Sequence, residues 1–76
     1  MNPGQERFLE FMMQRAKEGD SEGVKERLLK SFEEQKSAPL SRGGFEELKR
    51  QLLELIDDNH VHEVSNAMDH FGKQLH

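Results

Sequence analysis

Apolar residues recur along this chain at intervals of three and four, which is the spacing of amphipathic helices. No run alternates between apolar and polar residues, and the β-branched residues that favour strands are few: Val24, Ile56, Val61 and Val64. The pattern therefore predicts an all-α fold, a small bundle of four short helices arranged as two antiparallel hairpins. One continuous helix in place of the third and fourth is the alternative.

The first helix is predicted to begin after Asn2, a favourable N-cap that is followed by Pro3. Gln5 is placed to complete a capping box, and Gly19 is the expected end of the helix. Its apolar residues cover an arc of about 200°, wider than one side that faces a core: Phe8, Leu9, Phe11, Met12, Met13 and Ala16. Such an arc requires either a central position in the fold or contact with another chain.

The second helix is predicted to begin at Asp20 or Ser21 and to end before Pro39, because a residue that precedes proline disfavours the α conformation. Ser41 is the expected N-cap of the third helix, although Gly43 and Gly44 are poor residues for a first turn. Residues 37–44 are therefore expected to form a flexible loop between the two hairpins, within a single domain that spans residues 1–76.

The third helix carries an apolar face that is followed by Asp57, Asp58 and Asn59. Carboxylates and asparagine suit the start of a new helix, so a break at this point is favoured over a continuous helix. The fourth helix is then predicted from His60 towards Lys73, with one apolar seam of alternating three- and four-residue spacing: Val61, Val64, Met68, Phe71 and Leu75.

The size and composition of the chain favour self-association. It has 76 residues, of which 33% are hydrophobic, and it has no cysteine. A chain of this length buries only about 60% of its unfolded surface, and disulfides cannot strengthen the small core that results. We therefore expect a homodimer, or docking of another protein, through the surplus apolar faces of the first and fourth helices. The predicted contact residues are Phe8, Phe11, Met12, Met13, Val64, Met68 and Phe71.

The charge balance of the chain disfavours some classes of partner. A net charge of −4, with basic residues interleaved among acids, disfavours binding to nucleic acid and to anionic membranes. The first residues lack the charged and apolar regions of a signal peptide, and no apolar run reaches the ~18 residues of a membrane span. These features predict a cytoplasmic protein.

No motif in the chain indicates an enzyme. No serine lies in a Gly-x-Ser-x-Gly elbow, and Arg42-Gly43-Gly44 lacks the remainder of a phosphate-binding loop. We therefore expect no catalytic residues and no cofactor. The sequence instead predicts a non-enzymatic regulator or adaptor that acts by protein–protein interaction.

Metal binding is the alternative function, and its candidate ligands are His60, His62 and His70. Alternate residues of a helix point about 200° apart, so His60 and His62 cannot share one ion if both are helical. Neither His-Glu-x-x-His nor Glu-x-x-His occurs in the chain. The sequence therefore predicts no metal site, with these three histidines as the only weak candidates.

Overall fold

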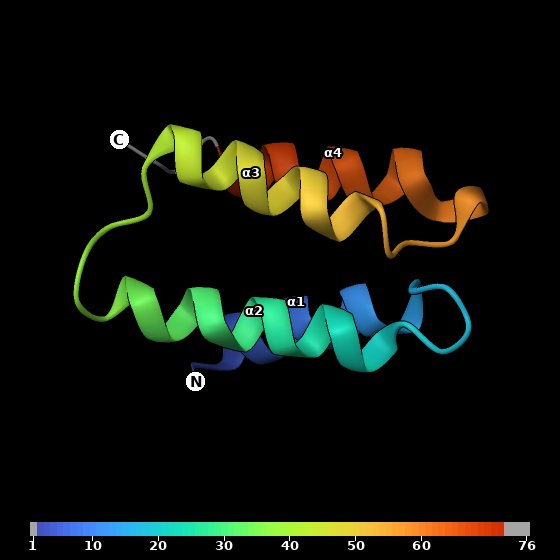
Figure 1. The fold of residues 1–76 in the computed structure, drawn as a ribbon, viewed down its shortest axis with the longest axis horizontal. Coiled ribbons are helices and arrows are strands. Elements are labelled where there is room, and N and C mark those ends of the chain that lie inside the picture. Colours follow the sequence, from blue (N-terminus) through green and yellow to red (C-terminus); the bar gives the residue numbers. More distant parts are fainter. Residues whose placement is uncertain (1, 73–76) are drawn as a thin grey trace.

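The computed structural model describes residues 2–72, which form four α-helices and one short 3₁₀ helix (Figure 1). The elements are α1 (Pro3–Gln14), α2 (Ser21–Gln35), α3 (Arg42–Leu53), η1 (Asp58–His60) and α4 (Val61–Gly72). Helices α1 and α2 form one hairpin, and α3 and α4 form the other. The predicted all-α bundle of two hairpins is confirmed.

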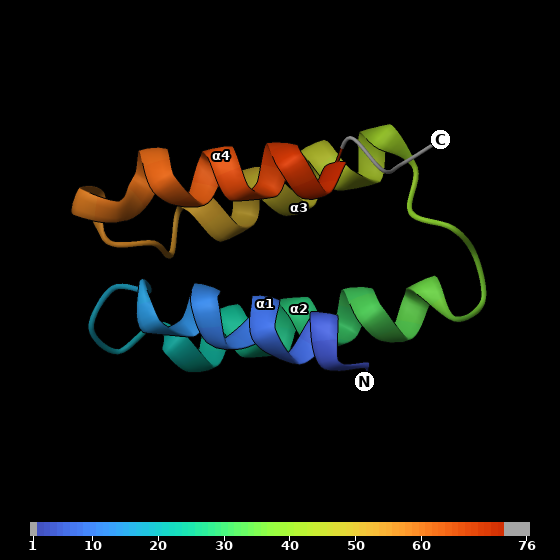
Figure 2. The same ribbon diagram turned by 180° about the vertical axis from the view of Figure 1, so that it is seen from behind.

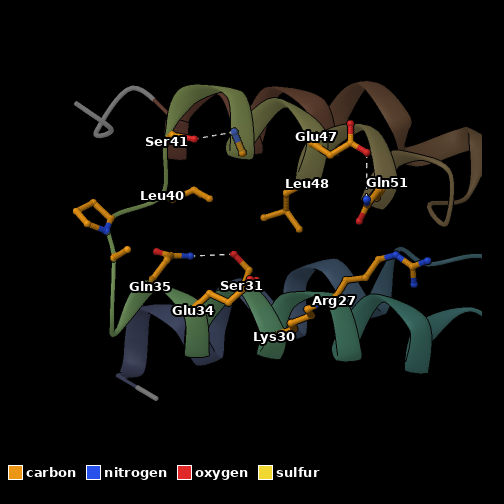
Figure 3. Close-up of a pocket in the computed structure, with 13 residues that line it drawn as sticks. Arg27, Lys30, Ser31, Glu34, Gln35, Leu40, Ser41, Glu47, Leu48 and Gln51 are labelled. Atoms are coloured by element: carbon orange, nitrogen blue, oxygen red, sulfur yellow. Dashed lines mark hydrogen bonds between the residues drawn. The ribbon is translucent and has the colours of Figure 1, made fainter.

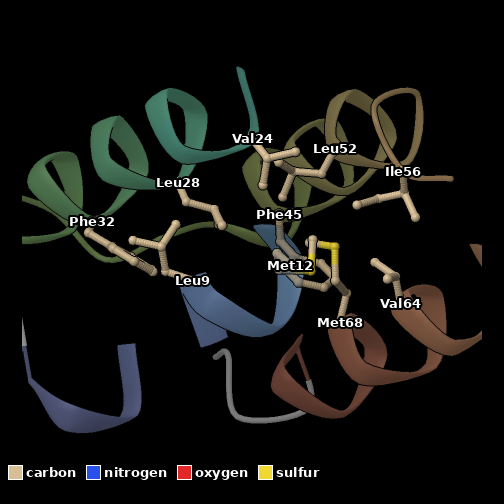
Figure 4. Packing of buried hydrophobic residues seen from close by; sticks show 10 residues of the cluster. All are labelled: Leu9, Met12, Val24, Leu28, Phe32, Phe45, Leu52, Ile56, Val64 and Met68. Atoms are coloured by element: carbon tan, nitrogen blue, oxygen red, sulfur yellow. The ribbon is translucent and has the colours of Figure 1, made fainter. Parts of the chain in front are cut away.

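The two hairpins lie against each other with the core between them. Helices α2 and α3 form one long face of the molecule (Figure 1), and α1 and α4 form the opposite face (Figure 2). Both hairpins contribute buried apolar side chains to a single cluster (Figure 4). Its members are Leu9, Met12, Val24, Leu28, Phe32, Phe45, Leu52, Ile56, Val64 and Met68.

The start of α1 is capped as its sequence predicts. The backbone N–H of Gln5 donates to Asn2 Oδ1 at 2.8 Å, and the backbone N–H of Asn2 donates to Gln5 Oε1 at 3.2 Å. This is a reciprocal capping box, with Pro3 as the first helical residue. These local bonds satisfy donors that an uncapped helix leaves free.

The end of α1 was predicted wrongly. The helix ends at Gln14, well before the expected stop at Gly19. The backbone N–H of Arg15 donates to the Met12 carbonyl at 3.1 Å, and that of Ala16 donates to the Met13 carbonyl at 3.3 Å. Gly19 lies instead in the turn that leads to α2, with a φ of 86°. Glycine adopts this left-handed conformation without the steric cost of a Cβ atom, so its role is in the turn rather than at the helix end.

A backbone contact between the two hairpins explains the early end of α1. Ala16 and Ile56 pair in an isolated antiparallel β-bridge, which joins the α1–α2 turn to the α3–α4 turn. Two hydrogen bonds flank it: Lys17 N–H to the Leu55 carbonyl at 2.8 Å, and Asp57 N–H to the Arg15 carbonyl at 2.9 Å. Backbone groups that a longer helix would have used are satisfied by the other hairpin.

The loop between the hairpins is shorter than the predicted range of 37–44. Ser41 caps α3 as expected, because its Oγ accepts the backbone N–H of Gly44 at 2.9 Å. Gly43 and Gly44 therefore belong to the first turn of α3, which corrects the end of the predicted loop. A Cβ atom at Gly44 would lie 3.1 Å from Ser41 Oγ, so the absence of a side chain there gives the cap room.

The break between the third and fourth helices is confirmed. Asp57 caps η1 by accepting the backbone N–H of Asn59 at 2.8 Å, and α4 begins directly after this 3₁₀ turn. Residues 73–76, which include Leu75 of the predicted seam, lie outside the described residues.

The described helices are short. The longest is α2, with 15 residues, whereas a membrane-spanning helix needs about 20. Within residues 2–72, no helix combines the length and the apolar character needed to cross a membrane.

Candidate functional site

Three of the predicted contact residues lie inside the molecule. Met12 and Val64 have no exposed surface, and Met68 is 1% exposed. They pack in the cluster between the hairpins (Figure 4). A second chain cannot reach them while this bundle is closed, so the predicted contact surface is reduced to Phe8, Phe11, Met13 and Phe71.

The four remaining residues do not form one patch. Phe11 and Met13 are two positions apart on α1, so their side chains point about 200° apart around the helix. Phe8 and Phe11 lie on the α4 side of α1, because Phe8 stacks on Phe71 and Phe11 contacts Arg15, which pairs with α4. Met13 is therefore on the other side of α1, so the wide apolar arc of this helix does not present one surface to a partner.

An aromatic pair joins α1 to α4. Figure 2 shows the face that these two helices form. The rings of Phe8 and Phe71 stack with their centroids 5.3 Å apart and their planes inclined by 14°. Both side chains are partly exposed. They border a surface hollow of about 430 Å³, here called the aromatic hollow, whose other lining residues include Phe32, Gln35, Ala67 and His70. This hollow can accept apolar side chains.

An ion-pair cluster lies on the same face, nearer the β-bridge. Arg15 Nε donates to Glu63 Oε1 at 2.8 Å, and the Arg15 guanidinium lies 3.8 Å from the centre of the Phe11 ring. His60 Nδ1 lies 3.1 Å from the same carboxylate oxygen. The hydrogen bond from Arg15 lowers the pKa of Glu63, and His60 lowers it further. The cluster joins the end of α1 to the start of α4.

We expect the Glu63→Gln variant to melt at a lower temperature than the wild type at neutral pH. The pKa of Glu63 is lowered in the folded chain from an ordinary value of 4.5. Its stabilisation is therefore complete above pH 4.5 and is lost as the pH falls through the folded pKa. Melting curves recorded from neutral to acidic pH should show that the difference in melting temperature between the wild type and Glu63→Gln becomes smaller.

Glu10 provides the control for this titration. It is exposed on α1 and has no ion pair within residues 2–72, so Glu10→Gln should melt close to the wild type at every pH. A difference between wild type and Glu63→Gln that grows on acidification would contradict the assigned pairing.

A second hollow lies on the opposite face, between α2 and α3 beside the loop of residues 36–41 (Figure 3). It has a volume of about 560 Å³ and is here called the α2/α3 groove. Figure 3 shows Leu40 and Leu48 pointing into it. Arg27 and Lys30 line it from α2, and Glu47 lines it from α3. The groove therefore combines an apolar floor with charged walls.

The candidate metal ligands are not brought together. His60 contacts Glu63, His62 is exposed near the start of α4, and His70 borders the aromatic hollow. Nowhere in residues 2–72 do three His, Asp or Glu side chains converge as they would around a metal ion. Over the same residues every buried side-chain polar atom has a hydrogen-bond partner. No observation in the described chain favours the metal-binding alternative.

Sequence reasoning did not identify the α2/α3 groove. Arg27 and Lys30 belong to an alternating series of charges along α2 that is typical of a solvated helix face. The break near Pro39 was a detectable signal, but the sequence does not show that Leu40 beyond it faces Leu48. No family model, curated protein or solved structure matches this chain.

Proposed function

We propose that this chain is a non-enzymatic helical protein of the cytoplasm that acts by protein–protein interaction, as a homodimer joined through its α1/α4 face. The observation that carries this proposal is the stacked pair of Phe8 and Phe71, which remains partly exposed beside the aromatic hollow. Aromatic residues are enriched where proteins meet, because they bury much surface with little loss of side-chain freedom.

The polar groups on this face are compatible with burial. Arg15 and Glu63 are already joined by a hydrogen bond within one chain. Covering them would therefore leave neither charge without a partner, which is the costly case at an interface. In a two-fold dimer the same patch serves both copies, so each contributes its aromatic side chains to the other.

The area that a stable dimer interface buries indicates how much of the α1/α4 face would contact the second copy. A standard interface buries about 800 Å² on each partner. One long side of a molecule measuring 32 × 20 × 20 Å is comparable in area. The aromatic hollow alone is too small for a stable dimer, so the contact would extend along α1 and α4 from the hollow to the Arg15–Glu63 pair.

Light scattering after size exclusion, over a series of protein concentrations, tests the dimer. We expect the wild type to have twice the mass of the chain and the Phe11→Ser variant to have the mass of one chain, because serine removes an apolar contact at the centre of the face. Circular dichroism of the variant checks that its helices are retained.

Met13→Ser is the matched control. Met13 is partly exposed on the same helix but points to the opposite side, so its replacement should leave the dimer intact. A wild type that stays monomeric at every concentration would refute the dimer. Equal dissociation of the two variants would show that the contact is not made through the α1/α4 face.

A further inference from the structure

We propose that the α2/α3 groove binds a peptide segment of a partner protein, one that carries apolar side chains next to carboxylates. Residues of α2 and α3 line the groove, and these helices lie on the opposite side of the molecule from α1 and α4 (Figures 1 and 2), so this inference is independent of the dimer. Its floor, its charges and its length each restrict the occupant.

The floor of the groove takes apolar groups. Leu40, from the loop, and Leu48, from α3, both point into the space between the helices (Figure 3). Each is only partly buried against the core. The volume of about 560 Å³ lies within the usual range for ligand sites, and the two leucines offer contact to one or two apolar side chains of a partner.

The unpaired charge of the groove is mainly positive. Arg27 makes one long hydrogen bond, of 3.4 Å, to the carbonyl of Gly23 in its own helix. No carboxylate pairs with Arg27 or Lys30 in the described part of the chain. Two cations therefore lie on the α2 wall of a protein whose net charge is −4, where they can bind carboxylates of a partner.

The acid on the α3 wall does not cancel these cations. Glu47 accepts hydrogen bonds from the side chains of Arg50 and Gln51, both on α3. The bond from Arg50 is the main cause of the lowered pKa of Glu47. The other carboxylate of the groove, Glu34, lies on α2 at the loop end. Carboxylates of the peptide are therefore expected near Arg27 and Lys30, away from that end.

The other polar side chains of the groove are engaged within the chain. Gln35 Nε2 donates to Ser31 Oγ at 3.0 Å, and Ser41 Oγ accepts the backbone N–H of Gly44. The charged side chains of the groove that have no ion pair within residues 2–72 are thus the two cations and, at the loop end, Glu34, and they lie beside two leucines. This combination favours an acidic, amphipathic segment over a neutral polar ligand.

The length of the groove suits a short segment of chain. Arg27 and Glu34 are seven residues apart on α2, which corresponds to about 10 Å along the helix. Two turns of a helix, or three to four extended residues, cover about that distance. A partner helix laid along α2 would place its apolar side in the groove and its acids on the α2 wall.

A library of random 16-residue peptides, displayed and selected against the full chain, tests the inference. We expect the selected peptides to share acidic residues next to apolar residues at intervals of three or four. Affinity for Lys30→Glu should be about tenfold weaker than for the wild type, because a like charge then faces the acids of the peptide.

Lys36→Glu is the matched control, because it changes the net charge by the same amount as Lys30→Glu. Lys36 is exposed at the end of α2 and does not line the groove. We expect Lys36→Glu to bind the selected peptides with the affinity of the wild type. Phe11→Ser should also keep this affinity, whether or not the chain forms a dimer. The inference fails if no peptide is enriched, if the enriched peptides are basic, or if Lys30→Glu and Lys36→Glu lose the same affinity.

Discussion

Replacing Met12 by alanine is expected to lower the free energy of unfolding by about 2–5 kcal/mol. The side chain has no exposed surface and lies in the cluster between the hairpins (Figure 4). Removing it exchanges buried contacts for a cavity that the surrounding helices fill only in part. Proteins have a total stability of about 0.05–0.15 kcal/mol per residue, so this loss is a large share of the whole for 76 residues.

Met13→Ala is the control, because it makes the same chemical change at the next residue. Met13 is partly exposed, so less apolar surface returns to water and no closed cavity forms. Urea denaturation of the two variants measures the difference, and Met12→Ala should have the lower midpoint. Equal urea midpoints for the two variants would show that Met12 is not in the core. A Met12→Ala variant that unfolds at the wild-type midpoint and loses only its self-association would show the same.

Replacing Gly72 by alanine is expected to destabilise the fold by about 1–3 kcal/mol, although alanine is the better helix former. A Cβ atom at this position would lie 2.7 Å from two ring carbons of Phe45, closer than side-chain atoms normally approach. Phe45 is 2% exposed and is held within the core, so its ring has little space to move. Gly72 therefore permits the close approach of α4 to α3.

Gly43→Ala provides the comparison. Gly43 is exposed in the first turn of α3, and a Cβ atom there would meet nothing within 4 Å. Alanine should stabilise the protein by up to about 1 kcal/mol at this site. In thermal and urea denaturation, the midpoint of Gly72→Ala should be lower than that of the wild type and the midpoint of Gly43→Ala should be higher. Adding Phe45→Leu to Gly72→Ala should recover part of the lost stability, because leucine is smaller than phenylalanine. A stabilised Gly72→Ala would contradict the packing.

The starts of α1 and α3 were predictable from sequence because they depend on local bonds. Asn2 and Ser41 each accept a backbone N–H from a residue three positions along the chain. Such bonds form in any context in which the chain turns into a helix, so the residue type and its position are enough to locate the start. The break between the third and fourth helices was predicted from the same residue types, but the sequence did not single out Asp57 as the cap of a 3₁₀ turn that precedes α4.

The end of α1 and the groove depend on residues far apart in the chain. Lys17 and Leu55 are joined by a backbone hydrogen bond although they are 38 positions apart in the sequence. The residues near Gly19 do not indicate that α1 ends before this contact. Leu40 and Leu48 likewise form a groove only because the second hairpin lies against α2. These features were missed because each is created by the packing of one hairpin on the other.

The apolar spacing of the sequence by itself determined that this chain forms four amphipathic helices in two hairpins. Only the tertiary structure decided which apolar side chains are covered. Met12 and Phe11 are equivalent in an apolar pattern, yet Met12 is fully buried and Phe11 remains partly exposed beside Arg15. The physical reason is that hydrophobic burial has no direction of its own, so the packing of the hairpins selects which apolar side chains form the core and leaves the others partly exposed.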